Sequence, residues 1–335
     1  MSSSEPEFND AREYSSLEEV MNTLLTAKGK SFRELDQTGR ALTGGNKGSL
    51  GQIIEESVLK YAINSDAAPD IHIGDTSYEL KVTPLKHIKK GKQTSAKERL
   101  VIDIINYLTL ADETDFESSK MWDKAKNIIL VYYYDDRTDK KKELRIDCKV
   151  LASYLMKYEA DDLATIKNDW HVIRDKVASG HADSLSESDT NYLAACTKGA
   201  NSKQLREAPA PAGANTATIF AKQRAFSLKT SYMTAIARKL LNRKSETVRL
   251  PIPQEQNLDE YVAAKFIPYT GKSSRDIASE LQVSAAPTAK NYNSSLAFAM
   301  LGASKSSISK IEQFSKANIS QFKSVTIYPD GLPRE

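Results

Sequence analysis

The stretch PDIHIGDTSYELKVTP, residues 69–84, decides the fold of this chain. Its apolar residues alternate on either side of residues 74–76, which is the pattern of two strands joined by a tight turn. Residues two apart on a strand point to the same face, so Glu79 and Lys81 are expected to project side by side. Asp70 begins the first strand and is expected to reach the same point across the hairpin.

This hairpin predicts a site for phosphate chemistry. Two converging carboxylates, Asp70 and Glu79, form a hard oxygen site suited to Mg²⁺. A metal held there stabilises charge on a phosphate and lowers the pKa of an attacking water, which Lys81 would orient or help to deprotonate. The competing interpretation of Glu-x-Lys is a solvated strand edge with a cross-strand ion pair, which an isolated instance favours. The preceding Pro69, a helix bearing Glu55 and the lysines that follow favour the catalytic interpretation.

The composition is that of a globular chain with a polar surface. Hydrophobic residues make up 40% of the 335 residues and charged residues 27%, which is enough for a packed core. The length suggests about two domains of roughly 150 residues. The formal net charge is only +3, so any contact with nucleic acid must come from local basic patches. Cys148 and Cys196 lie far apart without a Cys-x-x-Cys partner, so they predict neither a disulfide framework nor a zinc site.

No segment of the sequence predicts export or a membrane span. The N-terminal Met-Ser-Ser-Ser-Glu-Pro-Glu is polar and acidic, where a signal peptide needs basic residues and an apolar run. The longest apolar run, at residues 128–134, is far shorter than the ~18 residues of a membrane helix. We therefore expect a cytoplasmic protein without a membrane partner.

Helices and strands are expected to be interspersed, which predicts an α/β (α+β) fold with a mixed sheet flanked by helices. Ser16 would cap a helix with acidic residues in its first turn, and apolar residues recur at helical spacing from Ser49. The other predicted elements are helices at about 96–110 and at 167–179, a strand at 127–134, a strand or the start of one at 144–150, a surface loop at 207–215 and an ordered segment at 224–232.

A repeat divides the chain. The sequence Gly-Lys-Ser-Phe-Arg-Glu-Leu at 29–35 returns as Gly-Lys-Ser-Ser-Arg-Asp-Ile at 271–277. The predicted parts are a disordered N-terminus at 1–14, a catalytic domain at 15–245, a polar linker at 246–262 and the incomplete start of a second copy of the same fold at 263–335.

Further motifs accompany the hairpin in one order along the chain. They are Lys47-Gly-Ser-Leu-Gly-Gln-Ile-Ile-Glu55, Ala96-Lys-Glu-Arg-Leu100, Asp169-Trp170, Tyr192-Leu193, Lys198-Gly-Ala200 and Arg224-Ala-Phe-Ser-Leu-Lys229. Together they resemble the MutH and Sau-type GATC restriction endonuclease family, which has the PD-(D/E)xK nuclease fold. The resemblance runs from about residue 17 to 245 and implies that fold here.

The resemblance also implies a role for each matching residue. Asp70, Glu79 and the backbone carbonyl of Leu80 would bind Mg²⁺, Lys81 would be the catalytic lysine, and Glu55 would be an additional helix carboxylate facing the site. The residues expected near DNA are Lys47, Lys97, Lys198, Ser227 and Lys229. The alternative for the lysines at 198 and 229 is an ordinary surface position, and the basic run 87–97 could follow phosphates or be a solvated loop.

The second copy lacks the catalytic carboxylates. Aligned on the repeat, Phe298 takes the place of Glu55, and residues 321–326 take the place of 78–83 without an acidic residue. We predict no catalytic metal in this copy. Its lysines could still hold DNA without cutting it, namely Lys305, Lys310, Lys316 and Lys323. In the two-domain relatives this half is an allosteric DNA-binding domain, and the resemblance implies the same role here.

The resemblance implies a type II restriction endonuclease that cuts double-stranded DNA at 5′-GATC-3′ and leaves 5′-phosphates. Cutting both strands needs two active sites, so we expect a monomer that dimerises transiently on DNA or nicks the strands in sequence, alongside a cognate DNA methyltransferase. Ser227 stands where the nicking enzyme has a tyrosine that approaches the adenine methyl group, which predicts insensitivity to adenine methylation. The alternatives are a MutH-like repair nickase and a DNA-binding module without activity.

Overall fold

The computed structural model describes most of the chain. The described residues are 13–39, 49–61, 71–88, 93–138, 143–199, 204–241, 247–303, 308–320, 326–327 and 333–334. Lys47 and Asp70 lie outside these residues, as does most of the segment predicted to be a disordered N-terminus. In the described part of the chain, no helix has both the length and the apolar character that a membrane span requires.

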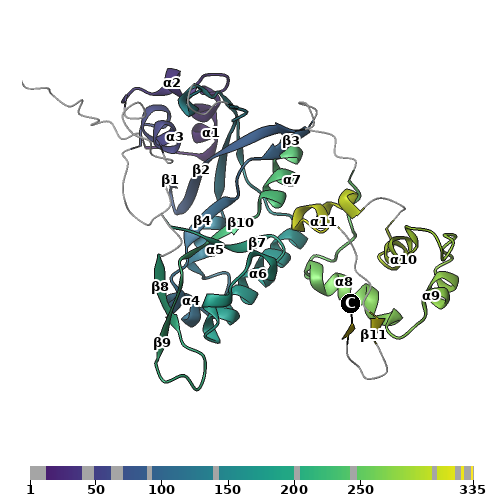
Figure 1. Cartoon of the computed structure of the whole chain (residues 1–335). Coiled ribbons are helices and arrows are strands. Elements are labelled where there is room, and N and C mark those ends of the chain that lie inside the picture. Colours follow the sequence, from purple (N-terminus) through teal and green to yellow (C-terminus); the bar gives the residue numbers. More distant parts are fainter. Residues whose placement is uncertain are drawn as a thin grey trace, which may run out of the picture.

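A mixed sheet of five strands forms the centre of the molecule (Figure 1). Its strands are β1 (Ile71–Ile73), β2 (Thr76–Ile88), β3 (Gln93–Ala96), β5 (Ile128–Tyr134) and β6 (Val150–Leu155). The predicted hairpin is confirmed, because β1 and β2 pair antiparallel with Ile71 opposite Tyr78. β2 also pairs parallel with β5, and β5 pairs antiparallel with β6. The predicted α/β (α+β) class with a mixed sheet is confirmed.

A second, antiparallel sheet lies beside the first. It contains β4 (Leu100–Ile104), β10 (Arg224–Leu228) and β7 (Leu193–Thr197), with β10 in the middle. Two further pairs of strands stand apart, namely β8 (Leu205–Pro209) with β9 (Thr218–Lys222), and β11 (Thr326–Ile327) with β12 (Pro333–Arg334). The predicted surface loop at 207–215 was therefore partly wrong, because Leu205–Pro209 is a strand and only the following turn is irregular.

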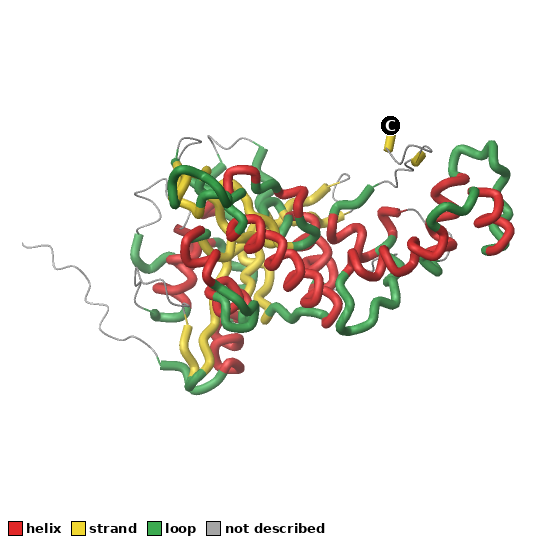
Figure 2. Tube along the Cα trace, turned by 90° about the horizontal axis from the view of Figure 1, so that it is seen from below, coloured by secondary structure: helices red, strands yellow, loops and turns green. Residues whose placement is uncertain are grey.

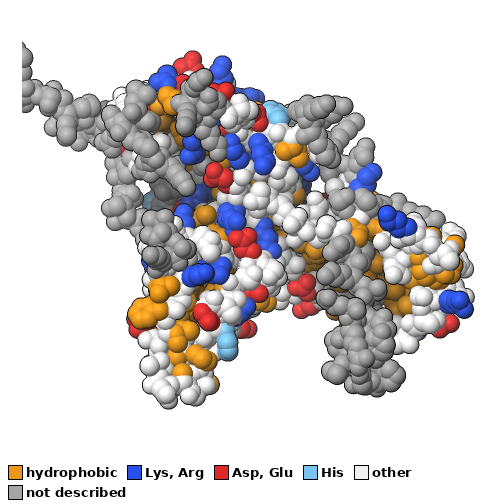
Figure 3. All heavy atoms as spheres, in the orientation of Figure 1, with side chains coloured by type: hydrophobic (Ala, Val, Ile, Leu, Met, Phe, Trp, Pro, Cys, Tyr) orange, Lys and Arg blue, Asp and Glu red, His pale blue; other side chains and the backbone are white. Residues whose placement is uncertain are grey.

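The hairpin of β8 and β9 projects from the lower left of the molecule (Figure 1). One face packs inward through Ala208 and Ala221, which are buried. The other face carries Leu205 and Phe220, both exposed, and Figure 3 shows hydrophobic side chains gathered on this hairpin.

Helices cover the strands on both sides, and α9 and α10 extend away from them (Figures 1 and 2). The α-helices are α1 (Leu17–Leu25), α2 (Phe32–Leu35), α3 (Ser49–Gln52), α4 (Tyr107–Asp112), α5 (Lys120–Ala125), α6 (Ala160–Ala178), α7 (Thr230–Leu240), α8 (Leu258–Phe266), α9 (Ser274–Glu280), α10 (Tyr292–Met300) and α11 (Glu312–Ala317). Short helical turns are η2 (Ile53–Val58), η3 (Arg145–Asp147), η4 (Ala182–Ser184), η5 (Glu187–Asp189), η6 (Ile267–Tyr269) and η7 (Ile308–Lys310). The predicted cap is confirmed, since the Ser16 side chain accepts a hydrogen bond from the Glu19 N–H.

One predicted element was wrong and another was only partly right. The helix expected at 96–110 is the end of β3, then β4, and only then the short helix α4. Val101, Ile102 and Ile104 are β-branched and pack well on a pleated sheet, and β4 pairs with β10. The segment 144–150, predicted to be a strand or the start of one, contains the turn η3, and strand β6 starts at its last residue, Val150.

The sheet separates two hydrophobic cores. β5 is buried on both faces, with Ile129, Val131 and Tyr133 in a smaller core against α1, α2 and η2. Its alternate residues, Ile128 and Leu130 among them, belong to the larger core with α6, α7 and the second sheet. A strand buried on both faces reads as a continuous apolar run, which is what the sequence of β5 shows.

The segment predicted to be a linker at 246–262 contributes to the larger core. Leu250, Leu258 and Tyr261 are buried there, together with Phe314 of α11. Residues from both sides of the predicted linker therefore share one core. The repeat has matching local geometry, because Ser31 and Ser273 both cap a helix and Gly29 and Gly271 have φ of +82° and +81°.

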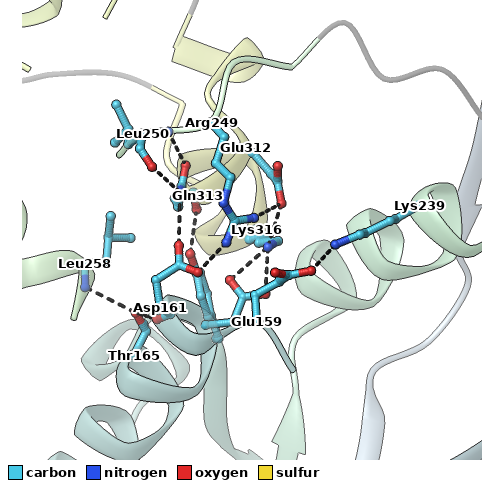
Figure 4. A network of polar contacts seen from close by, with 12 residues as sticks. Glu159, Asp161, Thr165, Lys239, Arg249, Leu250, Leu258, Glu312, Gln313 and Lys316 are labelled. Atoms are coloured by element: carbon cyan, nitrogen blue, oxygen red, sulfur yellow. Dashed lines mark hydrogen bonds and ion pairs between the residues drawn. The ribbon is translucent and has the colours of Figure 1, made fainter. Parts of the chain in front are cut away.

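Buried charges join α11 to α6 (Figure 4). The Lys316 ammonium lies 2.7 Å from the Asp162 carboxylate, with only 3% of the Lys316 side chain and 0% of the Asp162 side chain exposed. Beside them, Arg249 pairs with Asp161 and Glu312, and the Gln313 side-chain amide donates to Asp161 at 3.1 Å. Lys316 was predicted to be part of a basic DNA-holding surface, and this was wrong because its charge is buried against Asp162.

We expect Lys316→Met to lower the free energy of unfolding by about 3 to 5 kcal/mol, because it leaves the buried Asp162 without its cation. The double variant Asp162→Asn/Lys316→Met should recover part of this loss. Urea denaturation of both variants measures the effect. Lys272→Met, which breaks an exposed pair with Glu280, is the control and should leave the free energy of unfolding almost unchanged. A similar small loss in Lys316→Met would contradict a buried pair.

Candidate active site

Glu79 and Lys81 lie together in the first half of β2. The Lys81 Nζ donates to the Glu79 Oε1 at 2.5 Å. Only 9% of the Glu79 side chain and 25% of the Lys81 side chain are exposed. The side-by-side arrangement predicted from the spacing of two is thus what the structure shows.

At Glu79 and Lys81, strand β2 is paired on one side by β5. In this pairing Glu79 is in register with Ile128 and Lys81 with Leu130. On its other side β2 pairs with β1 only up to Tyr78 and with β3 only from Leu85, so the described residues give Glu79 and Lys81 no partner strand there. The low exposure of the Glu79 side chain does not fit a fully solvated edge, and the catalytic interpretation of Glu-x-Lys stays a prediction.

Asp70, the second predicted carboxylate, lies outside the described residues. Its neighbour Ile71 pairs with Tyr78, which is the residue before Glu79. The hairpin register therefore places Ile71, which follows Asp70, opposite Tyr78, which precedes Glu79. The position of the Asp70 side chain stays a prediction.

Leu80 lies between the two site residues and faces the smaller core, where it is buried. Glu55 belongs to the helical layer that packs against this core. It lies in η2, a π-helical turn, and π-helical turns often occur at functional sites. Its Oε1 points back over Gly51, where a Cβ would meet it at 3.6 Å. The metal role of the Leu80 carbonyl and the site role of Glu55 remain predictions.

The donor set suits a hard divalent cation. Carboxylate and backbone carbonyl oxygens are the ligands that Mg²⁺ takes in proteins. The described residues contain no group of three His, Cys, Asp or Glu side chains that could hold a metal, so this set needs Asp70 to be complete. Glu79, the Leu80 carbonyl and Asp70 are the residues that would hold the ion.

Lys97 is engaged by a carboxylate. Its Nζ lies 3.0 Å from the Asp135 Oδ2 and donates to the Asp135 backbone carbonyl at 2.7 Å. Arg137 binds the same carboxylate through its Nε at 2.8 Å. Burial raises the pKa of the Asp135 carboxyl, but the hydrogen bonds from Arg137 and Lys97 bring it well below its usual range. The structure gives Lys97 a clear role in anchoring the loop after β5, and its contact with DNA stays a prediction.

The other residues predicted near DNA spread along β7 and β10. Lys198 is exposed just after β7, and its N–H donates to the Gln223 carbonyl. Lys229 follows β10 at the other end of the pair, because the strands are antiparallel with Thr197 opposite Arg224. Ser227 has 0% exposure and its hydroxyl donates to the Ala194 carbonyl at 3.4 Å. Lys198 and Lys229 are therefore at opposite ends, and Ser227 is not at the surface.

Sequence reasoning gave Asp169 no role, although it noted the Asp-Trp pair as a motif. This carboxylate lies in α6 and accepts backbone hydrogen bonds from Asn191, Tyr192 and Leu193 at 2.6 to 2.9 Å. Burial raises its pKa to about 7, although those three hydrogen bonds lower it. Asp169 thus fixes the start of β7. The sequence signal that could have indicated this role was a charged residue beside a tryptophan on an apolar helix face, because a buried carboxylate needs hydrogen-bond partners.

Comparison with known proteins confirms the predicted resemblance. Residues 59–169 match the family model described as DNA mismatch repair enzyme MutH, and this segment contains Asp70, Glu79 and Lys81. The chain is 36% identical over 314 residues to the type II restriction enzyme Sau3AI of Staphylococcus aureus, which covers 91% of this chain and 61% of that protein. It is 26% identical over 225 residues to the DNA mismatch repair protein MutH of Shewanella woodyi, covering 66% of this chain and 90% of that protein. The chain thus spans less than two thirds of the length of Sau3AI.

We expect Asp135→Asn to lower the free energy of unfolding by about 1 to 3 kcal/mol at pH 7, because Lys97 and Arg137 lose their charged partner. The folded pKa of this carboxyl is depressed, so its contribution is present above about pH 4 and is lost as pH falls towards the folded pKa. The difference between variant and wild type should therefore narrow below pH 4. Chemical denaturation at several pH values measures it.

Asp136→Asn is the matched control. Asp136 is the next residue along the chain, and its carboxylate pairs with His87 at a partly exposed position. We expect a loss below about 1 kcal/mol for this variant. A difference for Asp135→Asn that stays constant from pH 7 to pH 2 would show that the ion pair does not account for its effect.

Proposed function

Because residues 59–169 belong to the MutH family and the chain is related to a type II restriction enzyme, we propose that this protein is a site-specific DNA endonuclease. The more specific proposal is a type II restriction endonuclease that needs Mg²⁺, cuts double-stranded DNA at 5′-GATC-3′ and leaves 5′-phosphates. The observation that carries it is the largely buried Glu79–Lys81 contact on a strand that pairs with β5.

This contact supports hydrolysis because of what each side chain can do. Mg²⁺ at Asp70, Glu79 and the Leu80 carbonyl would supply stabilisation of negative charge on the phosphate. Lys81 carries three N–H donors, so it can bind Glu79 and still donate to a water or a phosphate oxygen. The pairing of β2 with β5 fixes the backbone of these residues, so that the lysine would approach the phosphate in one orientation.

Ser227 supports the proposal that adenine methylation is not read. A side chain that senses a methyl group in the DNA groove has to reach the surface. Ser227 is buried in β10, and its hydroxyl donates a hydrogen bond to the Ala194 carbonyl. The resemblance gives the nicking enzyme a tyrosine at this position, so the serine would remove that contact with the adenine methyl group.

The similarity to MutH over 90% of its length favours a repair nickase as the second candidate. The similarity to Sau3AI extends further along this chain, including residues after 245, and favours the restriction enzyme. A non-catalytic DNA-binding module is the third candidate, and the intact Glu79–Lys81 pair argues against it. As parts of the same proposal, the protein would act in the cytoplasm, dimerise on DNA, and work with a cognate DNA methyltransferase.

We expect Glu79→Gln and Lys81→Met each to lower the cleavage rate of plasmid DNA in Mg²⁺ by at least about 10²-fold, because each removes a group that contacts the reacting centre. Asp70→Ala should have the same effect. The rate of loss of supercoiled plasmid measures it, with thermal melts to check folding. Glu280→Gln, an exposed carboxylate paired with Lys272, should cleave at the wild-type rate. Wild-type rates in Glu79→Gln and Lys81→Met would reject the site.

We expect methylated and unmethylated GATC plasmids to be cut at equal rates, because the buried Ser227 cannot contact the adenine methyl group. Linear product with ends at GATC is expected, as read by gel electrophoresis and end sequencing. Accumulation of nicked circles without linear DNA would favour the repair nickase. Full protection by methylation would overturn the role of Ser227.

A further inference from the structure

The hairpin of β8 and β9 carries an exposed apolar face. Phe220 is 70% exposed, the highest fraction among the large hydrophobic side chains that the structure describes, and Leu205 is 52% exposed. Lys222 lies opposite Leu205 and Glu207 lies opposite Phe220, so the two apolar side chains are diagonal neighbours on one face of the hairpin. Exposing both to water costs free energy, which a partner on this face would recover.

The hairpin is held in place at both of its ends. At the strand end, the Tyr107 hydroxyl of α4 donates to the Lys222 carbonyl at 2.5 Å. At the turn, the chain passes so close to Gly180 that a Cβ there would lie 2.2 Å from the Pro211 nitrogen. The exposed face is therefore presented in a fixed orientation, which lowers the entropic cost of binding a partner.

The shape of the hairpin fits a groove of duplex DNA. Among the described strands, β8 and β9 pair only with each other, and the hairpin projects from the molecule (Figure 1). A two-stranded ribbon of this kind has a width that the major groove of B-DNA admits. The hairpin can thus enter the groove without the rest of the sheet.

Positive charge flanks the apolar face. Lys222 is exposed on the same face as Phe220. Lys198 is exposed at the base of the hairpin, where its N–H donates to the residue after β9. The carboxylate of Glu207 accepts a hydrogen bond from the Thr218 hydroxyl at 2.7 Å. Lysines beside an apolar face match a groove whose rims are phosphates.

A second copy of this chain fits the face less well. A specific protein interface covers roughly 800 Å² on each partner. Even a large aromatic side chain buries only about 150–250 Å², so a phenylalanine and a leucine supply a small part of that area. Self-association through this face would also bring the lysines of two copies together.

We propose that the β8–β9 hairpin enters the major groove of the DNA substrate and that Phe220 and Leu205 contact thymine methyl groups there. The thymine methyl is the apolar group that the major groove presents. The inference rests on the proposed endonuclease function for its partner. It adds a contact with bases, which carry sequence information, to the lysines expected near the phosphates.

Fluorescence anisotropy of a labelled duplex, without divalent metal, tests the proposal because it measures binding and not hydrolysis. We expect Phe220→Ala to bind about tenfold more weakly at every salt concentration, because an apolar contact releases no counterions. Lys222→Met should instead lower the slope of log affinity against log salt by about one. Leu25→Ala, which removes a leucine of α1 that is 61% exposed, is the control and should bind as the wild type does.

A duplex with uracil in place of thymine identifies the contacted group. We expect the wild type to bind this duplex about fourfold or more weakly than the thymine duplex, which is the effect of one methyl group. Phe220→Ala should show no such difference. Wild-type affinity in Phe220→Ala, or an equal uracil effect in both proteins, would overturn the proposal. So would a dimer of the full chain without DNA that Phe220→Ala dissociates, because the face would then belong to a second copy.

Plasmid cleavage in Mg²⁺ separates this inference from the proposed function. Absence of cleavage by the wild type, together with the expected effects of Phe220→Ala and uracil on binding, would reject the endonuclease and retain the hairpin contact. Cleavage by the wild type with unchanged duplex binding in Phe220→Ala would reject the hairpin contact alone. Because Phe220 is exposed, Phe220→Ala should melt at the wild-type temperature, which excludes misfolding as the cause of weaker binding.

Discussion

The parallel pairing of β2 with β5 is the constraint on which the rest of the structure depends. The register runs from Glu79 opposite Ile128 to Leu85 opposite Tyr134. Two parallel neighbours need a long crossover, and here it contains β3, β4 and two helices. Because β5 is apolar on both faces, helices must cover both sides of the sheet. The Glu79–Lys81 pair is thereby set inside a sheet whose backbone cannot shift register without exposing β5.

Buried charge makes the C-terminal segment part of the same body. Asp162 lies at 0% exposure in the first turn of α6, where a lone carboxylate would be costly. Its cation, Lys316, comes from 154 positions later in the chain. The adjacent Asp161 forms an ion pair with Arg249 and accepts a hydrogen bond from the Gln313 side-chain amide. Charges that are buried must find partners, so this network favours one docking geometry of α11 over any looser arrangement.

The antiparallel pairing of β7 with β10 separates two basic regions. Lys198 lies at the end near the β8–β9 hairpin, and Lys229 lies at the end near α7 and α11. Motifs that follow one another in sequence therefore need not share a surface. Asp169 fixes the end near Lys229 by holding the backbone of residues 191–193, so the geometry around that lysine depends on a carboxylate in another element.

The sequence by itself determined the hairpin, the adjacency of Glu79 and Lys81, the buried strand β5 and the mixed fold class, because a period of two and a long apolar run act over a few residues. It also gave the family resemblance, which the comparisons confirm. It failed at residues 96–110, where the pairing of β4 with β10 overrides local helical spacing. Only the tertiary structure decided that Lys316 is buried, that Lys97 is held by Asp135 and that Ser227 is inside the sheet. The physical reason is that burial and ion pairing depend on contacts between segments that are far apart in the sequence. A pattern over a few neighbouring residues does not specify such contacts.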